Sequence, residues 1–120
     1  MATNFVQPGD VIQYTAGADI ASGAVVKLGN ILGVALAAIA NGATGSVKIN
    51  GVFTVPKVTA AVIAQGESLT WDVSAGKFDD NAATPATGDV TGAAAVAFEA
   101  AGNGATTLNV MFTGVPGTVA

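Results

Sequence analysis

The sequence predicts an all-β protein: a compact β-barrel or β-tulip-like domain of short strands, with at most one short helix. Glycine and asparagine recur about every eight to twelve residues, and β-branched residues crowd the segments between them. Short strands at this spacing are typical of barrels and sandwiches. Several segments also alternate apolar and polar residues, which is the period of a half-buried strand. The length of 120 residues indicates a single domain.

The first strands are predicted at residues 11–15, 24–28 and 31–36. Each is a run of β-branched or aliphatic residues bounded by glycine or polar turn residues. Residues 1–10 are predicted to form an N-terminal arm that contains Phe5, Val6 and Pro8. Such an arm can pair with a sheet edge of a neighbouring molecule through backbone hydrogen bonds. A disordered leader is the alternative for this segment.

Residues 47–55 alternate throughout their length. The odd positions are apolar or glycine, whereas Lys48, Asn50 and Thr54 lie on the opposite side. Asn50-Gly51 could form a two-residue hairpin turn. Because the alternation continues through Gly51, one strand with a bulge or a close backbone approach at this glycine is favoured.

A single short helix is predicted at residues 59–65. Ala60, Ala61, Ile63 and Ala64 are compatible with one or two helical turns. Pro56 limits how early this helix can start, because the residue before a proline avoids the helical region.

Further strands are predicted at residues 68–73 and 77–78. Trp71 stands between polar Thr70 and Asp72, and this alternation favours core packing of the indole over ligand stacking. Residues 79–89 contain two adjacent acids, Pro85 and many small residues. They are predicted to form an exposed loop.

Two apolar faces are predicted near the C-terminus. The first consists of Val90, Ala94, Val96 and Phe98, with Glu99 on the other side. The second consists of Leu108, Val110 and Phe112, with Thr107 and Asn109 opposite. Residues 114–120 are predicted to be a frayed C-terminal tail, so residues 11–113 form the domain itself.

Two segments about sixty residues apart share an order of features. In each, a glycine is followed by an apolar strand, an Asn-Gly turn and an alternating strand that ends in phenylalanine. The first segment runs from Gly33 to Phe53 and the second from Gly92 to Phe112. Both are predicted to form hairpins. True internal repetition and chance similarity in a chain rich in alanine and glycine are both open.

The composition argues against a catalytic or metal-binding function. The chain has no histidine, cysteine or arginine. Without histidine, acid–base catalysis would need a carboxylate pair in an apolar cleft, and no pair is indicated. A metal could have only oxygen ligands, and the acidic start at Asp79-Asp80-Asn81 lacks the glycine that a calcium loop requires. No catalytic, cofactor-binding or metal-binding residue is therefore predicted, and the protein is not expected to be an enzyme.

The charged residues also limit the partners. The basic residues are four scattered lysines, at positions 27, 48, 57 and 77, so no patch for nucleic acid or an anionic membrane is expected. No apolar run approaches the roughly 20 residues of a membrane-spanning helix. The N-terminal residues lack a secretory pattern, and synthesis in the cytoplasm is expected.

The scarcity of charge is itself informative. Charged residues make up 10% of the chain, against about 25% in ordinary soluble domains. Such a surface suits contact with partner subunits, because little desolvation opposes it. A plain soluble domain with an alanine-rich surface is the alternative.

Several short motifs occur together in one order. They are Phe5-Val-Gln-Pro-Gly-Asp10, Ser22-Gly-Ala-Val-Val-Lys-Leu-Gly29, Gly33-Val-Ala-Leu36, Gly51-Val-Phe-Thr-Val-Pro-Lys57, Ile63-Ala-Gln-Gly66, Leu69-Thr-Trp-Asp72 and Gly76-Lys77. Each motif is weak by itself, but their order and spacing from residue 4 to about residue 112 resemble a family of phage and prophage proteins. This family was formerly catalogued as a domain of unknown function and is associated with capsid decoration, or cement, proteins.

The resemblance implies a function. Proteins of this kind are β-rich, barrel-like domains that bind the outer surface of an assembled phage head, commonly as homotrimers, and stabilise it. The implied partner is the major capsid protein, the implied location is the virion, and no catalytic residue or cofactor is implied. By their position in the arm, Phe5, Val6 and Pro8 are the candidate capsid contacts. An alternative function is a β-barrel adhesin or carbohydrate-binding module of a phage tail or cell surface, which predicts exposed aromatic residues over a shallow groove.

Overall fold

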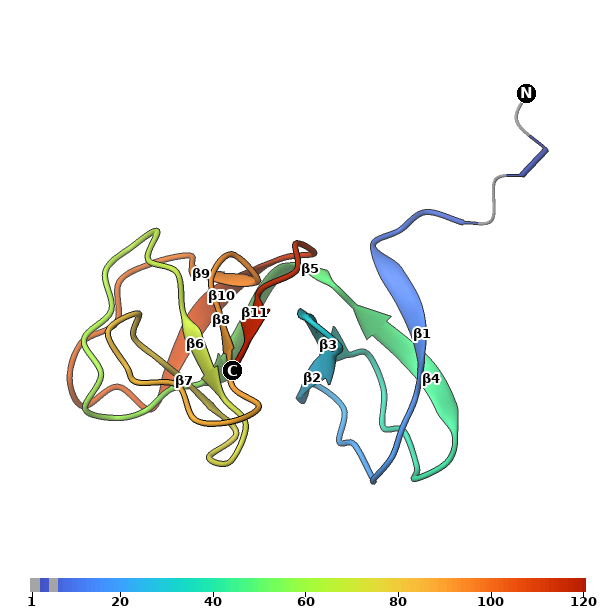
Figure 1. Cartoon of the computed structure of the whole chain (residues 1–120), viewed down its shortest axis with the longest axis horizontal. Helices are drawn as coiled ribbons and strands as arrows, with labels where there is room; N and C mark the ends of the chain where they lie inside the picture. Colours follow the sequence, from blue (N-terminus) through green and yellow to red (C-terminus); the bar gives the residue numbers. More distant parts are fainter. Residues whose placement is uncertain (1–2, 5–6) are drawn as a thin grey trace.

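The computed structural model describes residues 3–4 and 7–120, and these residues form strands and no helix (Figure 1). The all-β fold class is therefore confirmed. The strands are β1 (Val11–Thr15), β2 (Val25–Leu28), β3 (Ile31–Ala35), β4 (Thr44–Lys48), β5 (Asn50–Pro56), β6 (Thr70–Asp72), β7 (Lys77–Asp79), β8 (Val90–Thr91), β9 (Ala95–Ala97), β10 (Thr107–Thr113) and β11 (Thr118–Val119). No helix within the described ranges is long and apolar enough to span a bilayer.

The strands form three antiparallel sheets, with the orders β1-β4-β3-β2, β5-β10-β9 and β11-β8-β6-β7. These sheets do not close into the barrel that the sequence predicted. Isolated bridges between Ser68 and Val96, and between Lys57 and Phe78, connect the second sheet with the third. Closure requires a continuous ladder around the ring. Here β6, β7, β8, β9 and β11 have only two or three residues each, so the ladders end before they meet.

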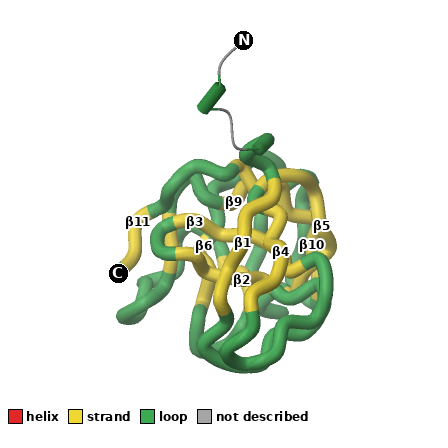
Figure 2. The backbone as a smooth tube through the Cα atoms, turned by 90° about the vertical axis from the view of Figure 1, so that its right-hand side faces the viewer, coloured by secondary structure: helices red, strands yellow, loops and turns green. Residues whose placement is uncertain are grey.

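The molecule has two lobes (Figure 1). We define the N-terminal lobe as residues 10–49, which carry the β1-β4-β3-β2 sheet, and the C-terminal lobe as residues 50–120, which carry the other two sheets. Figure 2 views the molecule from the side of the N-terminal lobe. The molecule measures 48 × 34 × 24 Å, and its longest axis runs through both lobes.

One extended segment connects the lobes. The chain passes from β4 in the first sheet through Ile49 into β5 in the second. Odd positions from Val47 to Val55 are buried or half-buried, while Val52 and Thr54 are exposed. Residues 47–55 therefore form extended chain, and the alternative of a hairpin turn at Asn50-Gly51 is wrong. Gly51 has a φ of 109°, which side chains rarely allow and glycine adopts readily.

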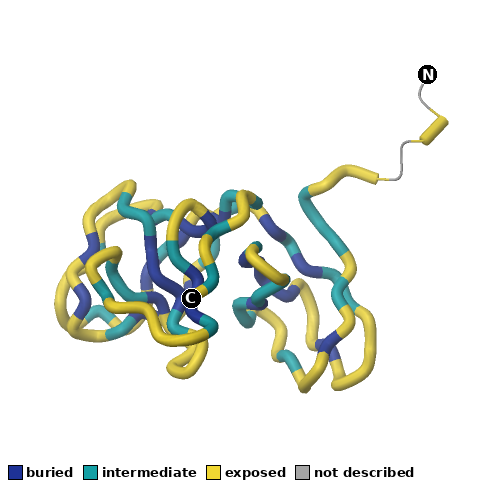
Figure 3. Tube along the Cα trace, viewed as in Figure 1, coloured by how far each residue is buried: buried dark blue, intermediate teal, exposed yellow. Residues whose placement is uncertain are grey.

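Two clusters of buried side chains form the interior (Figure 3). The large cluster fills the C-terminal lobe and contains Leu32, Val34, Val55, Ala61, Ile63, Leu69, Trp71, Phe78, Val90, Ala94, Ala95, Ala97, Leu108, Val110 and Phe112. The small cluster lies in the N-terminal lobe and contains Ala16, Val26, Ala35, Ile39, Val47 and Ile49. Strand β3 contributes to both clusters, so the two lobes share this strand.

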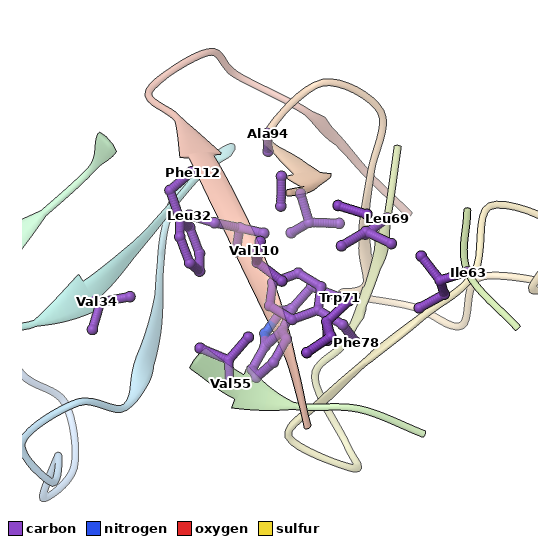
Figure 4. Packing of buried hydrophobic residues seen from close by; sticks show 14 of the residues in the cluster. Leu32, Val34, Val55, Ile63, Leu69, Trp71, Phe78, Ala94, Val110 and Phe112 are labelled. Atoms are coloured by element: carbon purple, nitrogen blue, oxygen red, sulfur yellow. The ribbon is translucent and has the colours of Figure 1, made fainter. Parts of the chain in front are cut away.

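Three aromatic rings lie at the centre of the large cluster (Figure 4). The ring centroids of Trp71 and Phe78 are 4.8 Å apart, and those of Phe78 and Phe112 are 5.9 Å apart. Only 7% of Trp71 is exposed, so its predicted core position is confirmed. The alternating face of Leu108, Val110 and Phe112 is also confirmed, since all three residues are buried.

The helix predicted at residues 59–65 does not form. Ala61 and Ile63 are buried while Val62 between them is 65% exposed, which is the period of an extended chain. The amide of Ile63 donates to the carbonyl of Ala101, and the amide of Ala101 donates back to Ile63. Pairing with this distant segment replaces the weak helical preference of the alanines.

The apolar face predicted for Val90, Ala94, Val96 and Phe98 is confirmed at Val90 and Ala94, which are buried, and is wrong beyond them. Phe98 is 49% exposed, whereas Ala95 and Ala97 are buried. Gly92, with a φ of 88°, turns the chain between β8 and β9. Ala94 and Ala95 are then buried in succession, so the inward register shifts by one residue and reverses the rest of the face.

The C-terminal residues do not fray as predicted. Strand β11 pairs with β8, the amide of Gly117 donates to the carbonyl of Asn30 at 2.7 Å, and the amide of Ala120 donates to Asp89 at 2.9 Å. Gly117 lies so close to the carbonyl of Thr91 that a side chain would have no space. These contacts attach the end of the chain to both lobes.

Two further predictions are confirmed. Strands β3 and β4 pair antiparallel, as do β9 and β10, so the two similar segments both contain hairpins. True internal repetition and chance similarity of the two segments both stay open. The exposed loop predicted at residues 79–89 is confirmed for residues 81–87, whereas Asp79 lies in β7 and Asp89 is buried.

Candidate contact surfaces

The N-terminal arm is the first candidate surface. Of its three predicted contact residues, Pro8 is described and exposed, whereas Phe5 and Val6 lie outside the described residues. Figure 1 shows that residues 7–9, just before Asp10 and β1, lead away from the N-terminal lobe. The side-chain amide of Gln7 donates to the carbonyl of Val11 at 2.6 Å. A shallow hollow of about 200 Å³ lies at this base of the arm.

Asp10 fastens the base of the arm to the first sheet. Its Oδ2 lies 3.3 Å from Lys48 Nζ, and its backbone carbonyl accepts from the amide of Ile49 at 3.0 Å. The hydrogen bond from Lys48 is the largest of the contacts that lower the pKa of Asp10 below its usual 3.8. Because both side chains are partly exposed, this ion pair contributes little stability, and its main effect is to fix the start of the arm.

The strand that follows the arm has a free edge. Among the residues that the structure describes, strand β1 is the outermost strand of its sheet and pairs on one side, with β4. Unpaired edges accept extended chains from other molecules. The same region of the N-terminal lobe therefore presents both an arm and an edge to which an arm can add.

Several carboxylates accept hydrogen bonds from backbone amides in turns and loops. Asp72 accepts from the amides of Ser74 and Ala75 and from the Ser74 hydroxyl, and this hydroxyl is the main cause that lowers its pKa. Asp89, only 4% exposed, accepts from the amides of Val73 and Ala86. Glu67, Asp79 and Asp80 likewise accept from backbone amides. Within the described ranges, no three metal-ligating side chains gather into a site.

Lys57 is a buried residue that the sequence reasoning missed. It is 1% exposed, and its Nζ donates to the carbonyls of Val58, Thr59 and Ala105. The amine thereby holds together two loops at one end of the C-terminal lobe. The position of Lys57 in the sequence could have indicated its burial, because Lys57 continues the inward-facing odd register of residues 47–55.

A groove separates the lobes. It consists of two adjoining hollows of about 430 and 350 Å³ that share Val25 and Trp71. The other lining residues include Tyr14, Ile20 and Val73. The single charged lining residue is Lys27, whose Nζ donates to the carbonyl of Gly88 at 3.0 Å and so joins the lobes. This groove is suited to apolar contact.

The exposed aromatic residues are few. Among the described residues, Phe98 is the one aromatic side chain in the exposed class. Trp71, Phe78 and Phe112 pack in the large cluster. Tyr14 and Phe53 are half-buried, and Tyr14 lines the groove between the lobes.

Comparison with known proteins places this architecture in a family. Residues 6–112 match the model of a family described as phage cement protein. The match extends from the arm through most of β10 and so includes both lobes. No curated protein matches the chain.

Proposed function

The chain belongs to the phage cement protein family, and we propose from this that it binds the outer surface of an assembled phage head and stabilises it. The match over residues 6–112 carries this proposal. The partner on the head is the major capsid protein. The protein is made in the host cytoplasm and becomes part of the virion, where its role is structural and involves no catalytic step.

We propose that the protein acts as a homotrimer. Charged residues are 10% of the chain, and seven large apolar side chains of the described residues are exposed. Contact between copies would cover part of this apolar surface at little cost in desolvation. Copies that are joined to one another also hold the shell by several linked contacts, which raises the overall affinity.

The arm is the proposed contact with the shell. Pro8 is exposed, and the chain around it leads away from the lobe. Phe5 and Val6 are the apolar residues next to it in the sequence. An arm of this composition can add to a sheet edge and place one or two apolar side chains in pockets of the partner.

Binding to heads tests the proposal. Purified protein is mixed with emptied, expanded heads of its phage, and co-sedimentation and the thermal stability of the heads are measured. We expect saturable co-sedimentation and a higher melting temperature of the decorated heads. Absence of co-sedimentation at micromolar concentration would contradict the cement function, and binding to a glycan array would then favour the alternative of a carbohydrate-binding module.

Arm variants test the contact residues. The double variant Phe5→Ser and Val6→Ser should weaken head binding roughly tenfold or more, because burial of one such side chain contributes about 1.5–3 kcal/mol. The matched control is Thr3→Ser with Asn4→Ser, which changes two arm residues without loss of apolar surface. Equal head affinity of the two double variants would exclude the arm as the contact.

A further inference from the structure

We infer that the groove between the lobes binds an acidic segment of the shell, in which one carboxylate side chain stands between apolar residues of an extended chain. The inference rests on the proposed function for its partner, and it adds a second contact with the shell. The two hollows of the groove, of about 430 and 350 Å³, both have the size of ordinary binding pockets. Their lining residues lie between positions 14 and 76 and therefore outside the arm.

The first polar group of the groove is the indole N–H of Trp71. Trp71 lines both hollows and is only 7% exposed. Its N–H makes no hydrogen bond to another described residue. In the described part of the chain no fully enclosed polar atom lacks a partner, so this N–H reaches the surface where Trp71 lines the groove. In Figure 4 the nitrogen lies on the side of the ring toward Val34 of β3. A mostly buried donor of this kind favours a ligand that brings an acceptor oxygen.

The second polar group is the ammonium of Lys27. It lines the larger hollow together with Trp71, and its Nζ donates to the carbonyl of Gly88 at 3.0 Å. An ammonium has three donors, so donors remain for a ligand. Among the described residues, Lys27 forms no ion pair. Two donors in one hollow, one of them positively charged, suit the two oxygens of a carboxylate.

No acidic side chain of the groove competes for this charge. The residues that line the two hollows include no aspartate or glutamate. Asp89 follows Gly88 in the sequence, but it is 4% exposed and its two oxygens accept from the amides of Val73 and Ala86. The groove therefore presents one cation and is complementary to a single negative charge.

The rest of the groove suits the apolar neighbours of the acid. Val25 lines both hollows, and Tyr14, Ile20 and Val73 contribute to the larger one. Val25 and Lys27 lie on the same face of β2, because successive side chains of a strand alternate. Apolar walls with a few polar groups that fix the orientation of the ligand are the usual composition of a binding site.

The acids of this chain favour another protein over a second copy as the partner. The chain has eight acidic residues. Each of them accepts a hydrogen bond within its own molecule, and they are Asp10, Asp19, Glu67, Asp72, Asp79, Asp80, Asp89 and Glu99. Placing one of them in the groove of a second copy would remove it from such a contact. The shell is the partner that the proposed function supplies.

Titration of the isotope-labelled full chain with a blocked peptide, acetyl-Val-Glu-Val-amide, tests the site by nuclear magnetic resonance. The chain has one tryptophan, so a single indole N–H resonance reports on the groove. We expect this resonance to shift saturably up to about 10 mM peptide. The peptide should bind roughly tenfold more tightly than its matched control, acetyl-Val-Gln-Val-amide, because hydrogen bonds to charged groups are stronger. Absence of a saturable shift, or equal affinity of the two peptides, would overturn the inference.

Variants of Lys27 separate recognition from a structural role. In Lys27→Met the two peptides should bind equally, because the ammonium is lost, and in Lys27→Arg the preference for the acidic peptide should remain. The matched control is Lys77→Met, since Lys77 is exposed and does not line the groove, and it should keep the preference. Thermal unfolding shows whether each variant is folded. A folded Lys27→Met variant that still prefers the acidic peptide would contradict the inference, and the peptide pair tests the wild type even if this variant does not fold.

Head binding separates this inference from the proposed function. Lys27→Met should bind heads roughly threefold or more weakly than the wild type and Lys77→Met. If the wild type binds heads and no peptide, the inference alone fails. If it binds the acidic peptide and no heads, the proposed function fails while the groove stays a site for acidic segments. If Lys27→Met binds heads like the wild type and instead loses association of copies in sedimentation equilibrium, a second copy occupies the groove and the inference is wrong.

Discussion

The two lobes differ in how much they bury. The large cluster of the C-terminal lobe has fifteen buried members with three aromatic rings in contact, whereas the small cluster of the N-terminal lobe has six and no aromatic ring. Five half-buried apolar residues border each cluster, so they are a larger share of the apolar residues in the N-terminal lobe, where they are Ile12, Tyr14, Ile20, Leu28 and Ile31. The stability of the molecule therefore resides mainly in the C-terminal lobe, and the N-terminal lobe has more to gain from a partner.

The lobes are nevertheless coupled. Leu32 and Val34 belong to a strand of the N-terminal lobe but pack in the large cluster. The segment from β4 to β5 passes between the sheets without a turn. We expect these links to make the chain unfold as one cooperative unit.

The largest expected effect is at the centre of the C-terminal lobe. Phe78 is fully buried between Trp71 and Phe112, so Phe78→Ala should lower the free energy of unfolding by about 3–5 kcal/mol. Urea unfolding followed by the fluorescence of Trp71, the single tryptophan, measures it. A loss below about 1 kcal/mol would mean that the large cluster is not the main source of stability.

Ile39→Ala makes the corresponding change in the N-terminal lobe. Ile39 is 3% exposed, and we expect a loss near the low end of the range for such truncations, about 2 kcal/mol, because the half-buried neighbours can close around the space. Unfolding is followed by Trp71 fluorescence and by the ring resonances of Tyr14, one probe in each lobe. The two transitions should coincide, and separate midpoints would show independent lobes.

Lys57→Met tests the buried amine. The variant keeps the length of the side chain but leaves the carbonyls of Val58, Thr59 and Ala105 without this donor, so a loss of about 1–3 kcal/mol is expected. Lys77→Met, at an exposed position, is the control and should change stability by less than about 0.5 kcal/mol. Similar effects of the two substitutions in urea unfolding would argue against a role of Lys57 in holding the loops.

The smallest effect is expected on the free energy of unfolding at acid pH. The pKa values of Asp10 and Asp72 are lowered in the folded chain, so their contribution is present above the usual value of 3.8 and is lost as the pH falls through the lower folded values. Unfolding of the wild type and of Asp72→Asn is compared from about pH 6 to about pH 2. The variant should lose less stability below pH 3.8, and equal curves would assign the acid sensitivity to other groups.

The alternation of apolar and polar residues predicted the buried side of a strand correctly where it continues over a long run. Residues 47–55 and 107–112 alternate over a long run, and the structure buries the expected sides. The prediction failed where pairing with residues far away in the sequence determines the local structure. Nothing near Ile63 reveals that Ala101 pairs with it, and no local pattern shows that the turn at Gly92 changes the register before Phe98.

The contact surfaces were less predictable than the fold. Position in the chain suggested the arm, whereas Val52, Val96 and Met111 lie on β5, β9 and β10 and become neighbours only through the sheet order. Met111 stands opposite a predicted core face, and the sequence alone could not place Val52 and Val96 on either side of it. Lys57 was missed because lysine is seldom buried.

The passage from β4 through Ile49 into β5 constrains the number of residues between the two sheets. Deleting or adding one residue between Val47 and Phe53 would turn Phe53 and Val55 outward and Thr54 inward, because successive side chains of a strand alternate between faces. Homologous proteins are therefore expected to keep the length of this stretch. Insertions and deletions should gather in the exposed loop at residues 81–87, where no register depends on them.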